Sequence, residues 1–187
     1  MRASILAVGL LAVMTLVGCA DEPAETSTST ANTGSAEPTS DDDGEPTTAP
    51  AEAGEDSEAG AEAFVRYYLE ALSDGYNHLA VGEIRAHALE ACVTCHEWAD
   101  AYAGTMEQGG TIVSGDATWR VGEIVVSSYE AGANAEVSAS VTIGEHTFTE
   151  SATATPVARP EVTFHFEFVV VRQDDSWAVE EMAESQM

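Results

Sequence analysis

The apolar residues of this 187-residue chain follow a helical period before residue 110 and a strand period after it. In the first part, apolar side chains recur at spacings of three and four residues, which is one stripe of an amphipathic helix. This stripe contains Ala61, Phe64, Val65, Tyr68, Leu69 and Leu72. The breaking sequence Ser73-Asp74-Gly75 predicts that the helix ends there.

A second strong helix is predicted before the change of period. Thr94 is followed three residues later by Glu97, which is a capping box and predicts a helix start at Cys95. Gly109 and Gly110 predict its end. Its inward-facing stripe is expected to contain Cys95, Trp98, Ala99, Tyr102 and Met106. A weaker helical segment, around residues 78–89, precedes this helix.

After residue 110, apolar and polar residues alternate, as in strands with one buried face. Strands are expected at residues 118–127, 135–143, 162–170 and 177–179. Turn-forming residues at 131–134 and 174–175 separate neighbouring strands. Helices followed by such strands predict an α+β domain, with two to three N-terminal helices packed on a curved, about four-stranded antiparallel sheet.

Composition limits the folded part to one domain at residues 59–187. Residues 20–58 contain no Leu, Ile, Val, Met or aromatic side chain and four Pro. A segment of this composition cannot bury enough apolar surface to offset the entropy lost on ordering. We therefore predict that residues 19–58 form a disordered acidic tether.

The first residues have the order of an export signal. A short positive start is followed by the apolar run 5–17, which is too short to span a membrane. The run ends in Leu16-Val17-Gly18-Cys19, which resembles the lipobox of bacterial lipoproteins. By this resemblance, residues 1–18 are a signal peptide, and Cys19 is acylated and holds the protein on the outer face of the cell membrane.

Charge restricts the class of partner. The chain has a formal net charge of −27 with only six Lys and Arg residues in total. This composition excludes the basic surface that nucleic-acid binding requires. The expected contact with the membrane is therefore the lipid, and the domain is expected to bind a small molecule or a protein.

The sequence Cys92-Val93-Thr94-Cys95-His96 is the main chemical motif. In an exported protein, pairing of Cys92 with Cys95 is the default, as a structural disulfide. The same residues spell C-x-x-C-H, the attachment motif of c-type haem, with His96 as the iron ligand. A redox-active pair at a helix start and a zinc site are further alternatives. We favour the disulfide and expect no cofactor or metal.

Three features resemble a family of actinobacterial lipoproteins to which no activity is assigned. They are the run 64–72, the C-x-x-C pair before a Trp- and Tyr-containing helix, and the segment 109–113. The layout of the domain also resembles the NTF2-like, cystatin-like cone, in which helices and a bent sheet enclose a pocket. In such a cone, the candidate pocket residues are Tyr68, Trp98, Tyr102 and Trp119.

These observations predict an accessory or ligand-binding lipoprotein with no catalytic residue assigned. The alternatives are an exported redox or haem protein that uses Cys92, Cys95 and His96, and a small NTF2-like enzyme. For the enzyme, His165 and Glu167 share one face of a predicted strand and could act as an acid and base pair.

Overall fold

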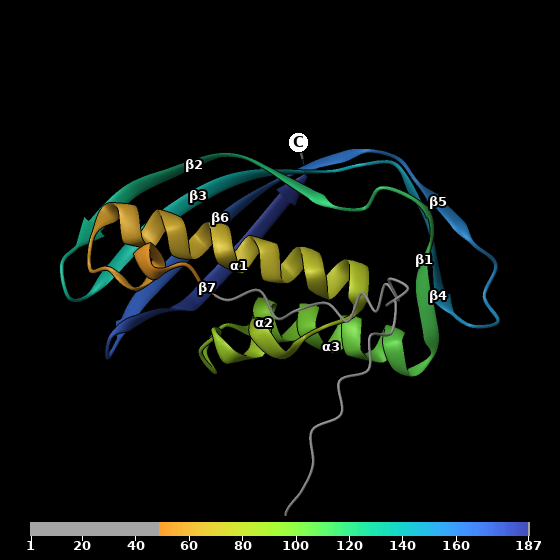
Figure 1. Ribbon diagram of the computed structural model, residues 1–187, viewed down its shortest axis with the longest axis horizontal. Coiled ribbons are helices and arrows are strands. Elements are labelled where there is room, and N and C mark those ends of the chain that lie inside the picture. The colour runs from red at the N-terminus through yellow and green to blue at the C-terminus, as the bar shows by residue number, and fades with distance from the viewer. Residues whose placement is uncertain (1–48, 187) are drawn as a thin grey trace, which may run out of the picture. The chain divides into compact units, whose positions relative to one another are not determined.

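In the computed structural model, which describes residues 49–186, helices come first and strands follow (Figure 1). The predicted signal peptide, Cys19 and most of the predicted tether lie outside the described residues. The helices are α1 (Glu58–His78), α2 (Gly82–Ala86) and α3 (Val93–Glu107), preceded by a 3-10 turn at Ala51–Gly54. The strands are β1 (Gly109–Gly115), β2 (Trp119–Glu130), β3 (Asn134–Ile143), β4 (His146–Ser151), β5 (Val157–Arg159), β6 (Val162–Gln173) and β7 (Ser176–Gln186).

The strands form two antiparallel sheets that are joined end to end. The larger sheet has the order β2-β3-β6-β7, and the smaller has the order β1-β4-β5. Because β1 leads into β2, β3 into β4 and β5 into β6 across breaks of two or three residues, the smaller sheet continues the larger one beyond a bend. Figure 1 shows β1, β4 and β5 turning away at one end of the molecule.

Small residues and a proline make this bend possible. Gly115 has a φ of 93°, and a Cβ there would lie 2.5 Å from the carbonyl oxygen of Glu145. A Cβ at Gly144 would lie 2.5 Å from the carbonyl oxygen of Asp116. Pro160, which cannot donate a hydrogen bond to a neighbouring strand, stands between β5 and β6. The bend therefore depends on residues that larger side chains cannot replace without a clash.

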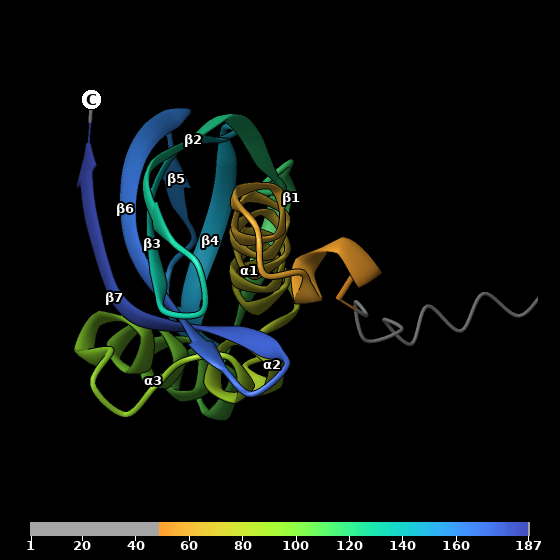
Figure 2. The same ribbon diagram turned by 90° about the vertical axis from the view of Figure 1, so that its left-hand side faces the viewer.

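Helix α1 carries the predicted apolar stripe into the core. Ser57 caps its start, because its hydroxyl accepts a hydrogen bond from the Gly60 N–H at 2.9 Å. All six residues of the stripe are buried. The helix packs against β2 and β3, and Figure 2 shows the sheet curving beside it, with α2 and α3 at the foot of the sheet.

The predicted end of this helix at residues 73–75 is wrong, since α1 continues to His78 and ends at Leu79 in the left-handed conformation. The small residues serve tertiary packing instead. The Ser73 hydroxyl accepts a hydrogen bond from the Trp119 N–H at 3.1 Å. At Gly75, a Cβ would lie 2.7 Å from the Ile84 side chain. Close packing thus explains a sequence that otherwise signals a helix end.

Two details of the predicted second helix are also wrong. Helix α3 begins at Val93 with Cys92 as the N-cap residue, so Thr94 lies inside the first turn and is not the cap. Met106 is 52% exposed and does not belong to the inward stripe. The disulfide of Cys92, described below, fixes the start of α3 where the capping box was expected to do so.

The last residues of the predicted tether belong to the folded domain. Ala53 is buried, although it lies five residues before the predicted boundary at residue 58. The backbone oxygens of Gly54 and Glu55 accept hydrogen bonds from Arg172 and Trp177, at 3.0 and 2.9 Å. Backbone groups make these contacts, which explains why a composition lacking large apolar side chains did not reveal them.

The helices and the larger sheet share one apolar core. Its largest fully buried side chains are Trp177, Tyr68, Phe166, Phe168, Leu69, Leu72 and Ile84. Within residues 49–186, no helix has both the length and the apolar composition needed to cross a membrane.

Candidate functional site

A cavity of about 610 Å³ lies where α3 and the end of α1 meet the bend of the sheet. Its wall comes from both helices and from strands on either side of the bend. The lining residues are Tyr76, Glu97, Trp98, Ala101, Tyr102, Trp119, Ile143, His146, Arg159, Pro160, Val162, Phe164 and Gln186. Ligand sites of this kind are mostly apolar and carry a few polar groups that orient the ligand.

The bend brings two basic side chains into the cavity wall. His146 is the first residue of β4, and Arg159 is the last residue of β5. They are direct cross-strand partners in the antiparallel pair of β4 and β5. Side chains at such positions point to the same face and lie close together. His146 is buried, whereas the Arg159 side chain is 49% exposed.

His146 is held by hydrogen bonds at both ring nitrogens. Its Nδ1 lies 2.8 Å from the carbonyl oxygen of Gly144, which can only accept, so Nδ1 carries a proton. Its Nε2 lies 2.6 Å from the hydroxyl of Tyr76. In the neutral ring, Tyr76 therefore donates to Nε2. Burial raises the pKa of the Tyr76 hydroxyl, and the charge of Arg159 opposes this effect.

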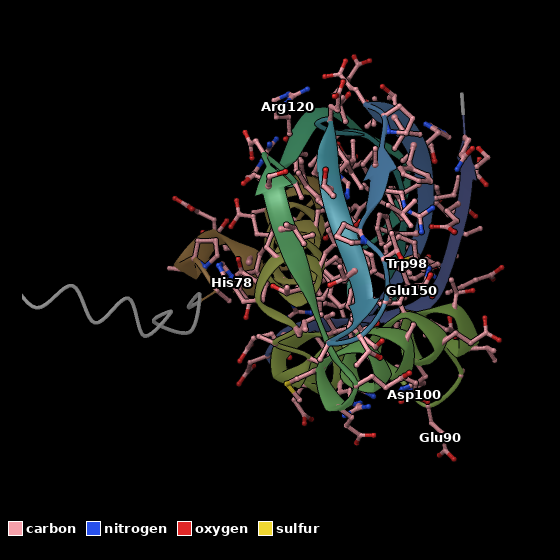
Figure 3. The ribbon with its side chains drawn as sticks, turned by 90° about the vertical axis from the view of Figure 1, so that its right-hand side faces the viewer. His78, Glu90, Trp98, Asp100, Arg120 and Glu150 are labelled. Carbon is pink, nitrogen blue, oxygen red and sulfur yellow. A yellow bond between two sulfur atoms is a disulfide. The ribbon has the colours of Figure 1, made fainter. Side chains whose placement is uncertain are left out.

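Five of the eleven other lining residues are aromatic. The ring centroid of Trp98 lies 5.6 Å from that of Trp119 and 5.8 Å from that of Tyr102, in edge-to-face arrangements. The Tyr102 ring in turn contacts the Tyr76 ring at 5.8 Å. In Figure 3, Trp98 lies on the strand side of α3, whereas Asp100 lies at the outer surface. The rings thus support one another as a continuous apolar surface.

Two buried donors in this wall have no hydrogen-bond partner among the described residues. They are the hydroxyl of Tyr102 and the indole Nε1 of Trp119. Burial raises the pKa of Tyr102 well above its ordinary value, so the hydroxyl stays protonated. Each unpaired buried donor costs about 1–3 kcal/mol, and such groups in a native protein require an explanation.

The structure brings three of the four candidate pocket residues together. Trp98, Tyr102 and Trp119 line the cavity. Tyr68 does not, because its side chain is fully buried against Phe168, with ring centroids 6.2 Å apart. Its position on the α1 stripe directs it into the core.

Sequence reasoning missed the polar end of the cavity. Tyr76 lies beyond the predicted end of the first helix, and His146 and Arg159 lie in strands that were not predicted. One signal was present in the sequence. Gly144 and Pro160, which mark breaks between strands, stand within two residues of His146 and Arg159.

Cys92 and Cys95 form a disulfide with 5.3 Å between their Cα atoms. Both residues are buried, and the Nε2 atom of His96 lies 3.1 Å from the carbonyl oxygen of Leu89. With the sulfurs bonded to each other, neither is free to form a thioether to haem. In the part of the chain that the structure describes, no group of three or more His, Cys, Asp or Glu side chains could hold a metal ion.

The predicted acid and base pair lies away from this cavity. On β6, Phe166 is buried, so its neighbours His165 and Glu167 point to the outer face of the sheet. Glu167 lines a depression of about 300 Å³. Alternation along the strand therefore separates these two residues from the aromatic wall.

Comparison with known proteins gives a likeness in fold. No protein-family model matches the chain, and no curated protein sequence matches it. The intermembrane space region of the chloroplast protein ARC6 is 15% identical, with a TM-score of 0.50 over 70% of this chain and 98% of that chain. An uncharacterised protein with a cystatin-like fold from Caulobacter vibrioides is 6% identical, with a TM-score of 0.45 over 66% and 87%. A ketosteroid isomerase-like protein from Erwinia carotovora atroseptica is 18% identical, with a TM-score of 0.45 over 67% and 95%.

The predicted fold class is confirmed. The chain has an α+β architecture, in which helices pack on a bent antiparallel sheet, and it is similar in fold to the ARC6 region. The larger sheet has the four strands that were expected, and the smaller sheet adds three. The likeness concerns the fold alone, because folds of this type host both enzymes and binding proteins.

Proposed function

We propose that this protein is an exported lipoprotein whose domain binds a small, largely apolar ligand in the cavity beside α3. A lipid on Cys19 would anchor it to the outer face of the cell membrane, and the acidic segment that follows would hold the domain away from the membrane. The lipobox and the apolar run before it support the anchor. The likeness to actinobacterial lipoproteins is part of the same proposal.

The observation that carries the ligand-binding part is the set of aromatic rings in the cavity wall, with His146 and Arg159 at one end. A cavity of about 610 Å³ is within the usual range for small-molecule sites. The Tyr102 hydroxyl and the Trp119 indole nitrogen are enclosed within the wall, so the polar group of the ligand is expected at the end of the cavity that carries His146 and Arg159. The ligand that fits best is therefore an aromatic or alicyclic molecule with at least one acceptor oxygen.

The disulfide favours a structural role over a redox role. Exchange requires a thiolate to reach a sulfur atom, and Cys92 and Cys95 are only 1% and 0% exposed. The loop before α3 is also tied to β7, since the Leu89 N–H donates to the carbonyl oxygen of Val179 at 2.8 Å. The bond therefore holds this loop and the start of the helix that carries Trp98.

The anchor is tested by the intact mass of the protein isolated from its host. We expect a chain that begins at an acylated Cys19 and is lighter by two hydrogens than the reduced form. A cytosolic protein that retains Met1 and no acyl group would contradict the anchor.

Ligand binding is tested on the chain from Ala20 to Met187 with the neutral fluorescent probe N-phenyl-1-naphthylamine. We expect saturable binding that Trp98→Ala weakens about tenfold, since a ring that contacts the ligand is lost. The matched control is Val125→Ala, because Val125 is 44% exposed and does not line the cavity. Absence of saturable binding, or equal effects of the two variants, would contradict the proposal.

A further inference from the structure

We infer that the ligand is a monocarboxylate, whose carboxylate pairs with Arg159 while its apolar body lies against the aromatic wall. This inference rests on the proposed ligand-binding function and specifies the chemical class of the ligand. Three observations support it. They are the weak bonding of Arg159 to other residues, the groups that surround Arg159 in the cavity, and the presence of Glu97 in the same cavity.

Arg159 differs from the other arginines of the described residues in how it is held. Four of them make hydrogen bonds: Arg66 to Glu62 (3.2 Å), Arg85 to Asp100 (2.7 Å), Arg120 to Glu161 (2.6 Å) and Arg172 to the Gly54 carbonyl oxygen (3.0 Å). Arg159 has only an ion pair with Glu150 at 3.8 Å, and the Glu150 side chain is 76% exposed. Within residues 49–186, it is therefore the arginine whose guanidinium is most available, and it lines the cavity.

The surroundings of Arg159 form a polar end in a cavity whose wall is otherwise mainly apolar. His146 is its cross-strand partner, and Tyr76 is bound to His146 at 2.6 Å. The guanidinium presents a planar pair of N–H donors that matches a carboxylate. A protein with a net charge of −27 offers few such positions to an anion. An available cation beside aromatic rings therefore indicates that the ligand carries an anionic group.

The acidic side chain in the cavity limits the ligand to one negative charge. Glu97 of α3 lines the same cavity and would repel a second anionic group. A single guanidinium balances one carboxylate, whereas a phosphate dianion would keep an excess charge. A dicarboxylate or a phosphate ester therefore fits less well than an aromatic or alicyclic monocarboxylate.

The test compares 2-naphthoate with its neutral amide, 2-naphthamide, by isothermal titration calorimetry on the chain from Ala20 to Met187. We expect the carboxylate to bind at least tenfold more tightly than the amide. Arg159→Met should remove this preference by weakening 2-naphthoate about tenfold, and it should weaken 2-naphthamide much less, since the amide carries no charge. The matched control is Arg120→Met, which removes the same charge from an arginine outside the cavity wall.

Each outcome decides between the two proposals. If both compounds bind equally and Arg159→Met changes neither, the cavity binds apolar ligands and the carboxylate inference is wrong. If Arg120→Met weakens 2-naphthoate as much as Arg159→Met does, the preference reflects overall charge and the inference is also wrong. If neither compound binds and the neutral fluorescent probe does not bind either, the proposed function itself fails.

Discussion

The indole N–H of Trp177, on the last strand, donates to the carbonyl oxygen of Glu55, which precedes the first helix, at 2.9 Å. This bond closes the domain between its two ends. Asp56 adds to the closure, because its carboxylate accepts from the Gly132 N–H and the Tyr129 hydroxyl, both at 3.0 Å. The segment just before α1 is thus part of the folded unit.

Removal of residues before Ser57 is expected to destabilise the domain by about 2–4 kcal/mol. The truncation removes the hydrogen bonds from Trp177 and Arg172, each contributing about 0.5–1.5 kcal/mol, and it uncovers the surface that Ala53 covers. Urea unfolding of a chain that begins at Ser57, compared with one that begins at Ala49, measures the loss. Equal midpoints for the two chains would contradict this role.

Asp56 should also make stability depend on pH. Its hydrogen bond from the Gly132 backbone, followed by the bond from Tyr129, lowers its pKa below the ordinary value of 3.8. The native state therefore binds fewer protons than the unfolded state, and the stabilisation is present above pH 3.8 and declines as the pH falls through the lowered pKa. Asp56→Asn should lower the unfolding midpoint at neutral pH and flatten its decline in acid. An unchanged acid profile would show that this carboxylate is not the cause.

Loss of the disulfide is expected to cost about 2 kcal/mol, the entropic effect of a bond that closes a very short loop. The double variant Cys92→Ser/Cys95→Ser measures this cost by urea unfolding. Because both sulfurs are buried, the native protein should resist dithiothreitol, and its thiols should become reactive only in denaturant. Rapid reduction of the native protein would favour the redox alternative.

Much of the fold follows from periods in the sequence. The apolar stripe of α1 and the alternation along β3 and β6 each mark one face of the element. The residues on that face are mostly the ones that are buried. The bend and the smaller sheet do not follow in this way. They depend on contacts between residues about 30 positions apart, such as Gly115 with Glu145, which no local pattern records.

The candidate site was predictable to the extent that it consists of core aromatics. Trp98 and Tyr102 share a helix face, so their proximity follows from spacing alone. The bond between Tyr76 and His146 joins residues 70 positions apart and exists only because the sheet bends. The polar end of the cavity therefore required the tertiary structure.

Tyr102 allows stability and binding to be separated in one variant. Its buried hydroxyl has no partner among the described residues, so Tyr102→Phe should stabilise the empty protein by about 1–2 kcal/mol. The same change should leave the affinity for 2-naphthamide unchanged, because the hydroxyl oxygen is enclosed and does not face the cavity. Tyr68→Phe is the matched control, because the Tyr68 hydroxyl donates to the Ile84 carbonyl oxygen at 3.5 Å and its loss should bring no gain in stability. Urea unfolding and titration calorimetry measure the two effects, and a destabilised Tyr102→Phe protein would show that the hydroxyl already has a partner.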